Sequence, residues 1–184
     1  MAIPKVTTLR GGNFIDADLK KRDLSGLDLS GTNMAGADLT SSNLSNSNLS
    51  EANLDLSIMG WSDLKNANLF RASFTNAELN RAMLDGANLS EACLHQADLE
   101  SADLSFACLS RANLENAILF SAKLCSANLS DADLSSANLR CANLARANLD
   151  GACLARAAYD EDTVFPVGFD PIAAGMRKIK SRSS

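Results

Sequence analysis

Residues 127–136 read ANLSDADLSS, which is two copies of a five-residue unit with alanine first and leucine third. The unit recurs without a shift from Leu9 to Tyr159. Every fifth position holds Leu, Phe, Met or Tyr, and the position two residues earlier is nearly always Gly, Ala, Ser or Thr. An α-helix repeats every 3.6 residues and a strand every two, so neither puts a five-residue period on one side. The pattern predicts a solenoid.

The chemistry of each position predicts how one unit folds. The leucine must point inward, because burying such a side chain contributes about 1.5–3 kcal/mol and there are too many to leave in water. The alanine also faces the interior, at a corner that leaves room for little more than a methyl group. Asn, Asp, Ser and Gly fill the remaining positions and favour turns. Each unit is therefore a short extended piece followed by a bend.

Over residues 9–159 the units resemble the A(D/N)LXX motif of pentapeptide-repeat proteins. The resemblance implies an all-β fold, a right-handed quadrilateral parallel β-helix in which four five-residue units form one square coil. At the ordinary strand spacing of ~4.8 Å, about 7.5 such coils would stack into a rod roughly 36 Å long.

Two stretches depart from the repeat. Arg22 and Leu27 occupy positions that are small elsewhere, and we expect the first full coil to be distorted or open there. Residues 57–61 form the second irregularity, since Ile58 stands where Asn or Asp is usual.

The ends of a solenoid need caps, because an exposed terminal coil invites edge-to-edge association. We expect residues 1–8 to cap the N-terminal end, residues 9–159 to form the β-helix and residues 160–184 to cap the C-terminal end. The tail can lay Val164, Phe165 and Phe169 over the last coil.

Beyond these residues the sequence predicts a short C-terminal helix. Asp170 followed by Pro171 is typical of a helix N-cap and first turn, and a helix over 171–180 would place Ile172, Met176 and Ile179 on one face. The segment from Phe165 onward is also similar to the C-terminal segment of many cyanobacterial-type pentapeptide-repeat proteins.

A coil of four units turns the sequence into a map of the surface, because equivalent positions of successive coils stack in columns. One column alternates in charge at every step, which predicts a structural ladder of ion pairs. Its members are Glu51, Arg71, Glu91, Arg111 and Asp131.

A second, mostly acidic column is interrupted by Ile58 and Ile118, with Trp61 and Phe120 beside them. Exposed apolar side chains on a polar rod are candidates for contact with a partner protein. The alternative is that they are scattered singly, and that Trp61 merely stacks on Arg81 one coil along.

The residue types needed for catalysis or metal binding are sparse. The one histidine, His95, falls at a surface position where Glu115 is its neighbour one coil along, so we expect a surface hydrogen bond. The five cysteines show no C-x-x-C spacing, which argues against a zinc site, and no phosphate-binding motif is present. We predict no enzyme activity, no catalytic or metal site and no cofactor.

Charge and composition restrict the partners. The net charge of −5 and the pI of about 4.8 disfavour nucleic acid and anionic membranes. No apolar run approaches the length of a membrane-spanning helix and no signal peptide is evident, so we expect a cytoplasmic protein with reduced cysteines.

These observations favour a rigid protein-binding scaffold of unassigned role. The resemblance also offers an alternative, a DNA-mimicking rod that binds a type II topoisomerase, DNA gyrase. The 18 acidic and 12 basic residues of 9–159 have the right sign for this, although the alternating ladder dilutes the field. A third hypothesis is a fold with no specific partner. The sequence leaves a monomer and an end-to-end dimer both open.

Overall fold

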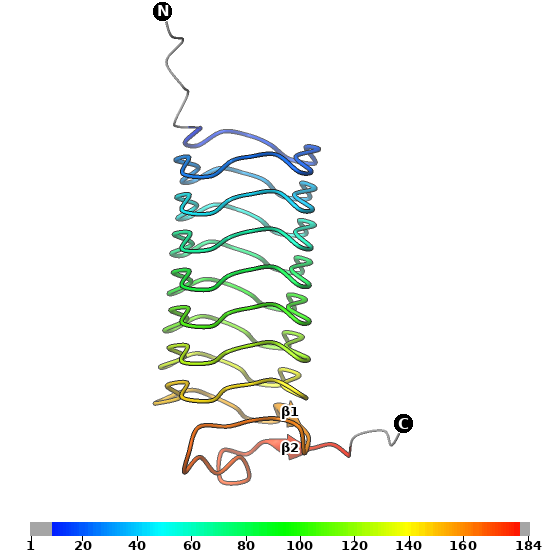
Figure 1. Ribbon diagram of the computed structural model, residues 1–184, viewed down its shortest axis with the longest axis vertical. Coiled ribbons are helices and arrows are strands. Elements are labelled where there is room, and N and C mark those ends of the chain that lie inside the picture. Colours follow the sequence, from blue (N-terminus) through cyan, green and yellow to red (C-terminus); the bar gives the residue numbers. More distant parts are fainter. Residues whose placement is uncertain (1–8, 181–184) are drawn as a thin grey trace, which may run out of the picture.

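The computed structural model describes residues 9–180 and shows a single stack of similar coils running from one end of a rod to the other (Figure 1). Parallel β-bridges join residues 20 positions apart, from Asn13–Asn33 to Asn138–Ala158, along four ladders. One coil therefore contains four units, and each ladder runs along one side of the rod. The chain is a β-helix solenoid. Its two named strands are β1 (Ala158–Tyr159) and β2 (Arg177–Lys178), near the C-terminal end.

The corners repeat one hydrogen bond and one backbone conformation. In one unit the N–H of Ala87 donates to the carbonyl oxygen of Leu84 at 3.0 Å, and Gly86 between them has a φ of 70°. A positive φ at the third residue is what a type II turn requires. Other residues adopt the same conformation at this third position of the turn, which we call the turn slot. Examples are Asn76 at 56° and Trp61 at 61°. For a residue other than glycine, asparagine or aspartate this costs about 1–2 kcal/mol.

The interior is filled by the two repeated positions. From Leu29 to Leu144 every side chain at the leucine position is buried, including Phe74. The small position is buried from Thr32 to Ala147. The predicted inward placement of both positions is confirmed over these coils.

Hydroxyl groups replace alanine at several small positions in the early coils. The hydroxyls of Thr32, Ser47 and Ser57 each donate to the carbonyl oxygen three residues earlier, at 2.7, 2.6 and 2.7 Å. The buried hydroxyls of Ser42 and Ser62 have no such partner within the described residues. The small position thus accepts a hydroxyl, with and without a hydrogen bond.

One side of the rod carries a ladder of side-chain amides that the sequence did not suggest. Asn48 donates to Asp28 at 3.1 Å, Asn68 donates to Asn48 at 2.9 Å, and Asn88 donates to Asn68 at 3.1 Å. Cys108 stands at the next step and interrupts the ladder. These bonds run parallel to the backbone ladder and reinforce the stacking of the coils.

The first full coil is much less distorted at Arg22 and Leu27 than we expected from the sequence. Both carbonyl groups accept ladder hydrogen bonds at 2.9 Å, from Asn43 and Asn48, and only the turn hydrogen bonds of Arg22 and Leu27 lengthen, to 3.3 and 3.4 Å. In this first coil Arg22 is exposed and Leu27 half-buried, so neither side chain has to fit a closed interior. The expected cap at residues 1–8 lies outside the described residues.

The coil around Ile58 is also regular. Ile58 bridges Asp38 on one side and Glu78 on the other, and its N–H donates to the carbonyl of Ala37 at 3.0 Å. The apolar residue at this position therefore changes the surface and leaves the backbone unchanged.

The helix expected over 171–180 is absent, and a turn followed by β2 takes its place. The side chain of Asp170 does accept hydrogen bonds from the N–H groups of Ile172 and Ala173, at 2.9 and 3.1 Å, as an N-cap would. The turn ends at Gly175, which has a φ of 73°. β2 then pairs in parallel with β1. A helix would bond internally and leave the open edge of the last coil without partners, which the strand supplies.

Aromatic side chains close the C-terminal end of the core. Phe165 packs edge-on against Tyr159 with ring centroids 5.5 Å apart, and Phe169 stacks on Phe165 at 5.1 Å. The expected contribution of Val164 is wrong, because Val164 bridges Asn143 in the ladder and its side chain is exposed. Residues 9–180 contain no helix with the length and hydrophobicity that a membrane span requires.

Candidate protein-binding face

The candidate contact residues of the sequence share one side of the rod. Ile58 and Ile118 belong to one ladder, separated by Glu78 and Asp98, and their exposed fractions are 38% and 40%. Three steps of the ladder correspond to roughly 14 Å at ordinary strand spacing. The structure thus places two apolar positions on one acidic face without bringing them into contact.

Both aromatic candidates lie beside an arginine. The guanidinium carbon of Arg81 lies 4.7 Å from the centroid of the Trp61 ring, and that of Arg140 lies 5.6 Å from the Phe120 ring. Trp61 remains 56% exposed, and Phe120 is half-buried. The stacking anticipated for Trp61 is present, and it still leaves more than half of the side chain open to a partner.

Leu56 lies near Ile58 and Trp61 in the same coil and is also exposed, and we call these three residues the apolar belt. Leu56 is 63% exposed and occupies the corner before Ile58, as Trp61 occupies the corner after it. Leu56 was not among the residues predicted from the sequence, although a leucine at the turn slot, which usually holds Asn, Ser, Gly or a charged residue, was a usable signal. Phe106, 71% exposed, holds the same slot on a different corner.

A groove lies beside Trp61 on the adjacent side of the rod. It encloses about 340 Å³, and Met83 is half-buried among its lining residues. Two ion pairs also line it, Lys65 with Asp85 at 3.8 Å and Lys123 with Asp103 at 3.2 Å. The remaining lining residues are Trp61, Arg81, Ala82 and Ser101.

The charged column forms a shorter network than the sequence suggested. Glu91 lies between two arginines, with Arg71 at 2.8 Å and Arg111 at 3.4 Å. The hydrogen bond from Arg71, aided by the positive charges of both arginines, lowers the pKa of Glu91 below its usual value. Within residues 9–180 no ion pair joins Glu51 to Arg71 or Asp131 to Arg111. His95 and Glu115 lie 3.4 Å apart on another corner.

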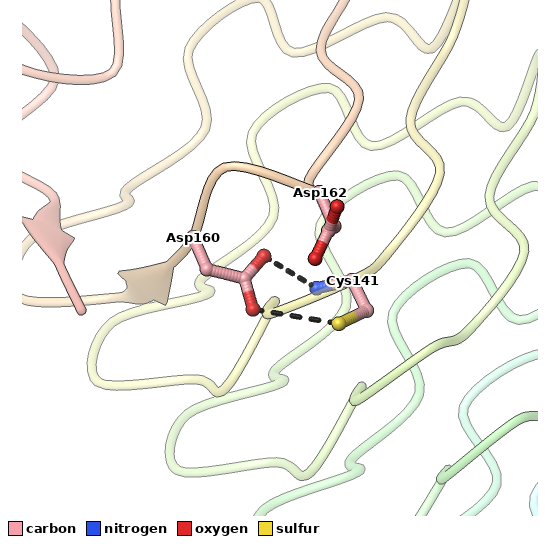
Figure 2. A group of neighbouring side chains, drawn as sticks. All are labelled: Cys141, Asp160 and Asp162. Atoms are coloured by element: carbon pink, nitrogen blue, oxygen red, sulfur yellow. Dashed lines mark hydrogen bonds between the residues drawn. The ribbon is translucent and has the colours of Figure 1, made fainter. Parts of the chain in front are cut away.

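A compact polar cluster fastens the C-terminal tail to the last coils. Figure 2 shows the carboxylate of Asp160 turned toward Cys141, whose backbone N–H and thiol donate to it at 2.9 and 3.4 Å. Thr163 donates a third bond at 2.9 Å. Burial by itself raises the pKa of Asp160, but the hydrogen bonds outweigh it and leave the pKa lowered. Burial and the adjacent carboxylate raise the pKa of the Cys141 thiol.

Cys141, Asp160 and Asp162 could each offer one ligand atom to a cation, within 4.8 Å of one another. The oxygens of Asp160 are already hydrogen-bonded, and the guanidinium of Arg140 lies 3.5 Å away. A positive neighbour and occupied lone pairs suit a structural anchor better than a cation site.

The sequence matches the family model for pentapeptide repeats eight times, over residues 7–34, 23–55, 62–100, 97–124 and 127–158. The chain belongs to the pentapeptide-repeat family. The matched ranges leave out residues 56–61, the segment that carries the apolar belt.

Solved pentapeptide-repeat structures resemble the chain. The protein alr5209 from Nostoc Pcc 7120 is 46% identical over 55% of this chain and 84% of its own, with a TM-score of 0.55. HetL, a pentapeptide-repeat protein involved in heterocyst differentiation regulation in the cyanobacterium Nostoc sp. strain PCC 7120, is 32% identical over 76% and 84%, with a TM-score of 0.40. QnrB1, a plasmid-mediated fluoroquinolone resistance protein, is 18% identical over 92% and 84%, with a TM-score of 0.66, a likeness of fold alone. No curated protein matches the chain.

Proposed function

We propose that this pentapeptide-repeat protein is a non-enzymatic, rigid scaffold that binds another protein through the apolar belt of Leu56, Ile58 and Trp61. The observation that carries the proposal is the exposure of three large apolar side chains at one level of a polar rod. A few residues near the centre of a contact supply most of the binding energy in protein interfaces, and tryptophan is enriched among them.

The bulky residues of the apolar belt are not explained by a contribution to the stability of the fold. Leu56 and Trp61 adopt left-handed φ values of 60° and 61°, a conformation in which glycine or asparagine is less strained. Burial in the core does not compensate for this strain, because both side chains are exposed. Bulky residues in a left-handed conformation with exposed side chains favour a role outside folding, and Leu56 and Trp61, unlike Phe106, occupy the corners on either side of exposed Ile58.

Ile118 and Phe120 provide a second contact in this proposal. They lie on the same side of the rod, three coils along. A partner that spans roughly 14 Å could touch both apolar positions while facing the acidic residues between them. The ion pairs around Glu91 then serve to stabilise the rod.

The experiment is an affinity capture from a lysate of the source organism, with the retained proteins identified by mass spectrometry. The wild type is compared with an Ile58→Lys/Trp61→Lys variant and with a Phe106→Lys control, which alters an exposed apolar residue on a different corner. A protein retained by the wild type and the control but lost from the belt variant supports the proposal. The proposal is contradicted if all three proteins retain the same partners, or if the wild type retains no protein.

The gyrase-binding rod is the second candidate, and the acidic balance of residues 9–159 favours it. Several carboxylates are nevertheless neutralised locally, such as Asp38 by Lys20 at 2.9 Å and Asp103 by Lys123 at 3.2 Å. Local pairing weakens the continuous negative field that a DNA mimic needs. Inhibition of gyrase supercoiling by micromolar protein would favour this candidate over the scaffold.

The proposal extends to the setting of the protein. We infer a cytoplasmic scaffold in which residues 9–159 form the binding rod and the segment that follows closes its C-terminal end. The five cysteines are unpaired, which supports a reducing compartment. Size-exclusion chromatography with light scattering distinguishes a monomer from an end-to-end dimer.

A further inference from the structure

The groove beside Trp61 offers a specific chemistry to the partner. Arg81 stacks on the Trp61 ring, and within residues 9–180 no hydrogen bond or ion pair holds its guanidinium group. The group therefore presents unused N–H donors at the rim of the groove, next to an exposed aromatic face. An arginine ordered by stacking loses less side-chain entropy on binding than a free one.

The other charged residues that line the groove are matched in pairs. Lys65 lies beside Asp85 and Lys123 beside Asp103, so Arg81 leaves the lining with one net positive charge. The chain as a whole carries −5. The lining of the groove therefore carries a small positive charge on an acidic rod, and Arg81 is its one cation without an anionic partner among the described residues.

We propose that the groove binds an acidic, partly apolar segment of the partner protein, with one carboxylate on Arg81 and an adjacent apolar side chain against Trp61 and Met83. The proposal rests on the protein-binding function and names the chemistry of the partner. The planar donors of arginine match a carboxylate with two parallel hydrogen bonds. The exposed ring and the half-buried Met83 supply the apolar contact.

A polyanion fits the same groove poorly. A nucleic acid presents phosphates at regular spacing, but Lys65 and Lys123 are already paired with Asp85 and Asp103, which leaves Arg81 as the one unpaired cation of the lining. Phosphates beyond Arg81 would have to displace these carboxylates from their lysines. One carboxylate followed by an apolar residue satisfies Arg81 without breaking either ion pair.

The test is a selection from a random dodecapeptide library against the immobilised full chain, with depletion on an Arg81→Gln variant. The affinity of each selected peptide is then measured through the fluorescence of Trp61, the single tryptophan of the chain. We expect enrichment of peptides with Asp or Glu next to a large apolar residue. Loss of a charge-assisted hydrogen-bond pair should weaken their binding to Arg81→Gln by about tenfold or more.

The matched control is Arg111→Gln, which removes an exposed arginine at the same turn slot on another corner. Its affinity should equal that of the wild type. Enriched peptides that lack carboxylates, equal binding to Arg81→Gln, or no enrichment at all would overturn the proposal. Equal or tighter binding of a single-stranded oligonucleotide or of inorganic phosphate would also overturn it, in favour of a general anion site.

The affinity capture with both variants separates the groove proposal from the scaffold proposal. If the captured partner is lost from the Ile58→Lys/Trp61→Lys variant but retained by Arg81→Gln, the belt binds a partner of different chemistry. If neither variant changes what is captured, the scaffold proposal itself fails.

Discussion

The guanidinium carbon of Arg81 lies 4.7 Å from the centre of the Trp61 ring, although the two residues are separated by a full coil. Both occupy the left-handed turn slot, at 60° and 61°, and both side chains lie outside the core. The pair belongs to the surface, so changes to it should affect binding and leave the fold intact.

Replacing Trp61 with asparagine should change the free energy of unfolding by no more than about 1 kcal/mol, because asparagine suits the left-handed slot and this offsets the lost stacking with Arg81. Leu64→Ala, in the adjacent core, should cost about 2–5 kcal/mol. Urea unfolding followed by circular dichroism measures both changes. A loss for Trp61→Asn as large as that for Leu64→Ala would mean that the tryptophan side chain is structural.

The small position should tolerate a large residue only at the first coil. Ala107→Leu inserts extra carbons into a buried corner and should destabilise the fold by about 1–3 kcal/mol or more. Leu27 is half-buried in the first coil, so Leu27→Ala should cost less than the about 2–5 kcal/mol of a core leucine. Thermal unfolding compares the two variants. A loss for Leu27→Ala as large as that for the core variant Leu64→Ala would show that the first coil is as tightly packed as the centre.

The buried hydroxyls provide a matched pair. Ser42→Ala removes an oxygen without a partner within the described residues and should be neutral or stabilising by up to about 1 kcal/mol. Ser47→Ala removes a hydrogen bond of 2.6 Å and should cost about 0.5–1.5 kcal/mol. The two midpoints of urea unfolding should therefore move in opposite directions or differ clearly. Equal shifts would count against this difference in hydrogen bonding.

The ion pairs of Glu91 should give a small, salt-sensitive contribution. Glu91→Gln should lower the melting temperature slightly at low ionic strength, with a smaller effect at high salt, because the pairs are partly exposed and screened. Glu51→Gln is the control and should have no effect, since Glu51 forms no ion pair with Arg71 in the described part of the chain. A salt-independent loss for Glu91→Gln would point to packing.

The contribution of Asp160 to the stability of the fold should disappear at acid pH. Its pKa is lowered in the folded state, so its contribution is present above the ordinary value of about 3.9 and disappears as the pH falls through the folded value. The wild type should therefore lose its advantage over Asp160→Asn below about pH 4. Urea midpoints between neutral and strongly acidic pH measure this, with Asp162→Asn as the control. A constant difference across this range would exclude Asp160 as the titrating group.

The five-residue period determines most of the fold because each position has one physical role. Leucine and alanine can only face inward, and the turn slot accepts many residues since its side chain leaves the coil. The same permissiveness limits the prediction of the binding face. Leu56 and Phe106 are unusual at that slot, but the periodic pattern only places them at the surface and does not show which surface residues contact a partner.

The C-terminal end shows where local signals fail. Asp170 and Pro171 carry a helix start signal, and Asp170 does cap the turn. The open ladder of the last coil nevertheless needs backbone partners, so the chain continues as β2. Asn143 pairs with Val164, one position further along the chain than the regular ladder spacing. This insertion moves Val164 out of the core and Phe165 toward it.

Site-specific photo-crosslinking can show whether the apolar belt is the protein-binding face. A photoreactive phenylalanine analogue is placed at position 58, 61 or 106 in turn, with circular dichroism to verify the fold, and the crosslinked products in lysate are identified by mass spectrometry. We expect one common partner to be crosslinked from positions 58 and 61 and not from 106. A partner crosslinked equally from all three positions, or from 106 alone, or no crosslink from 58 and 61, would contradict it.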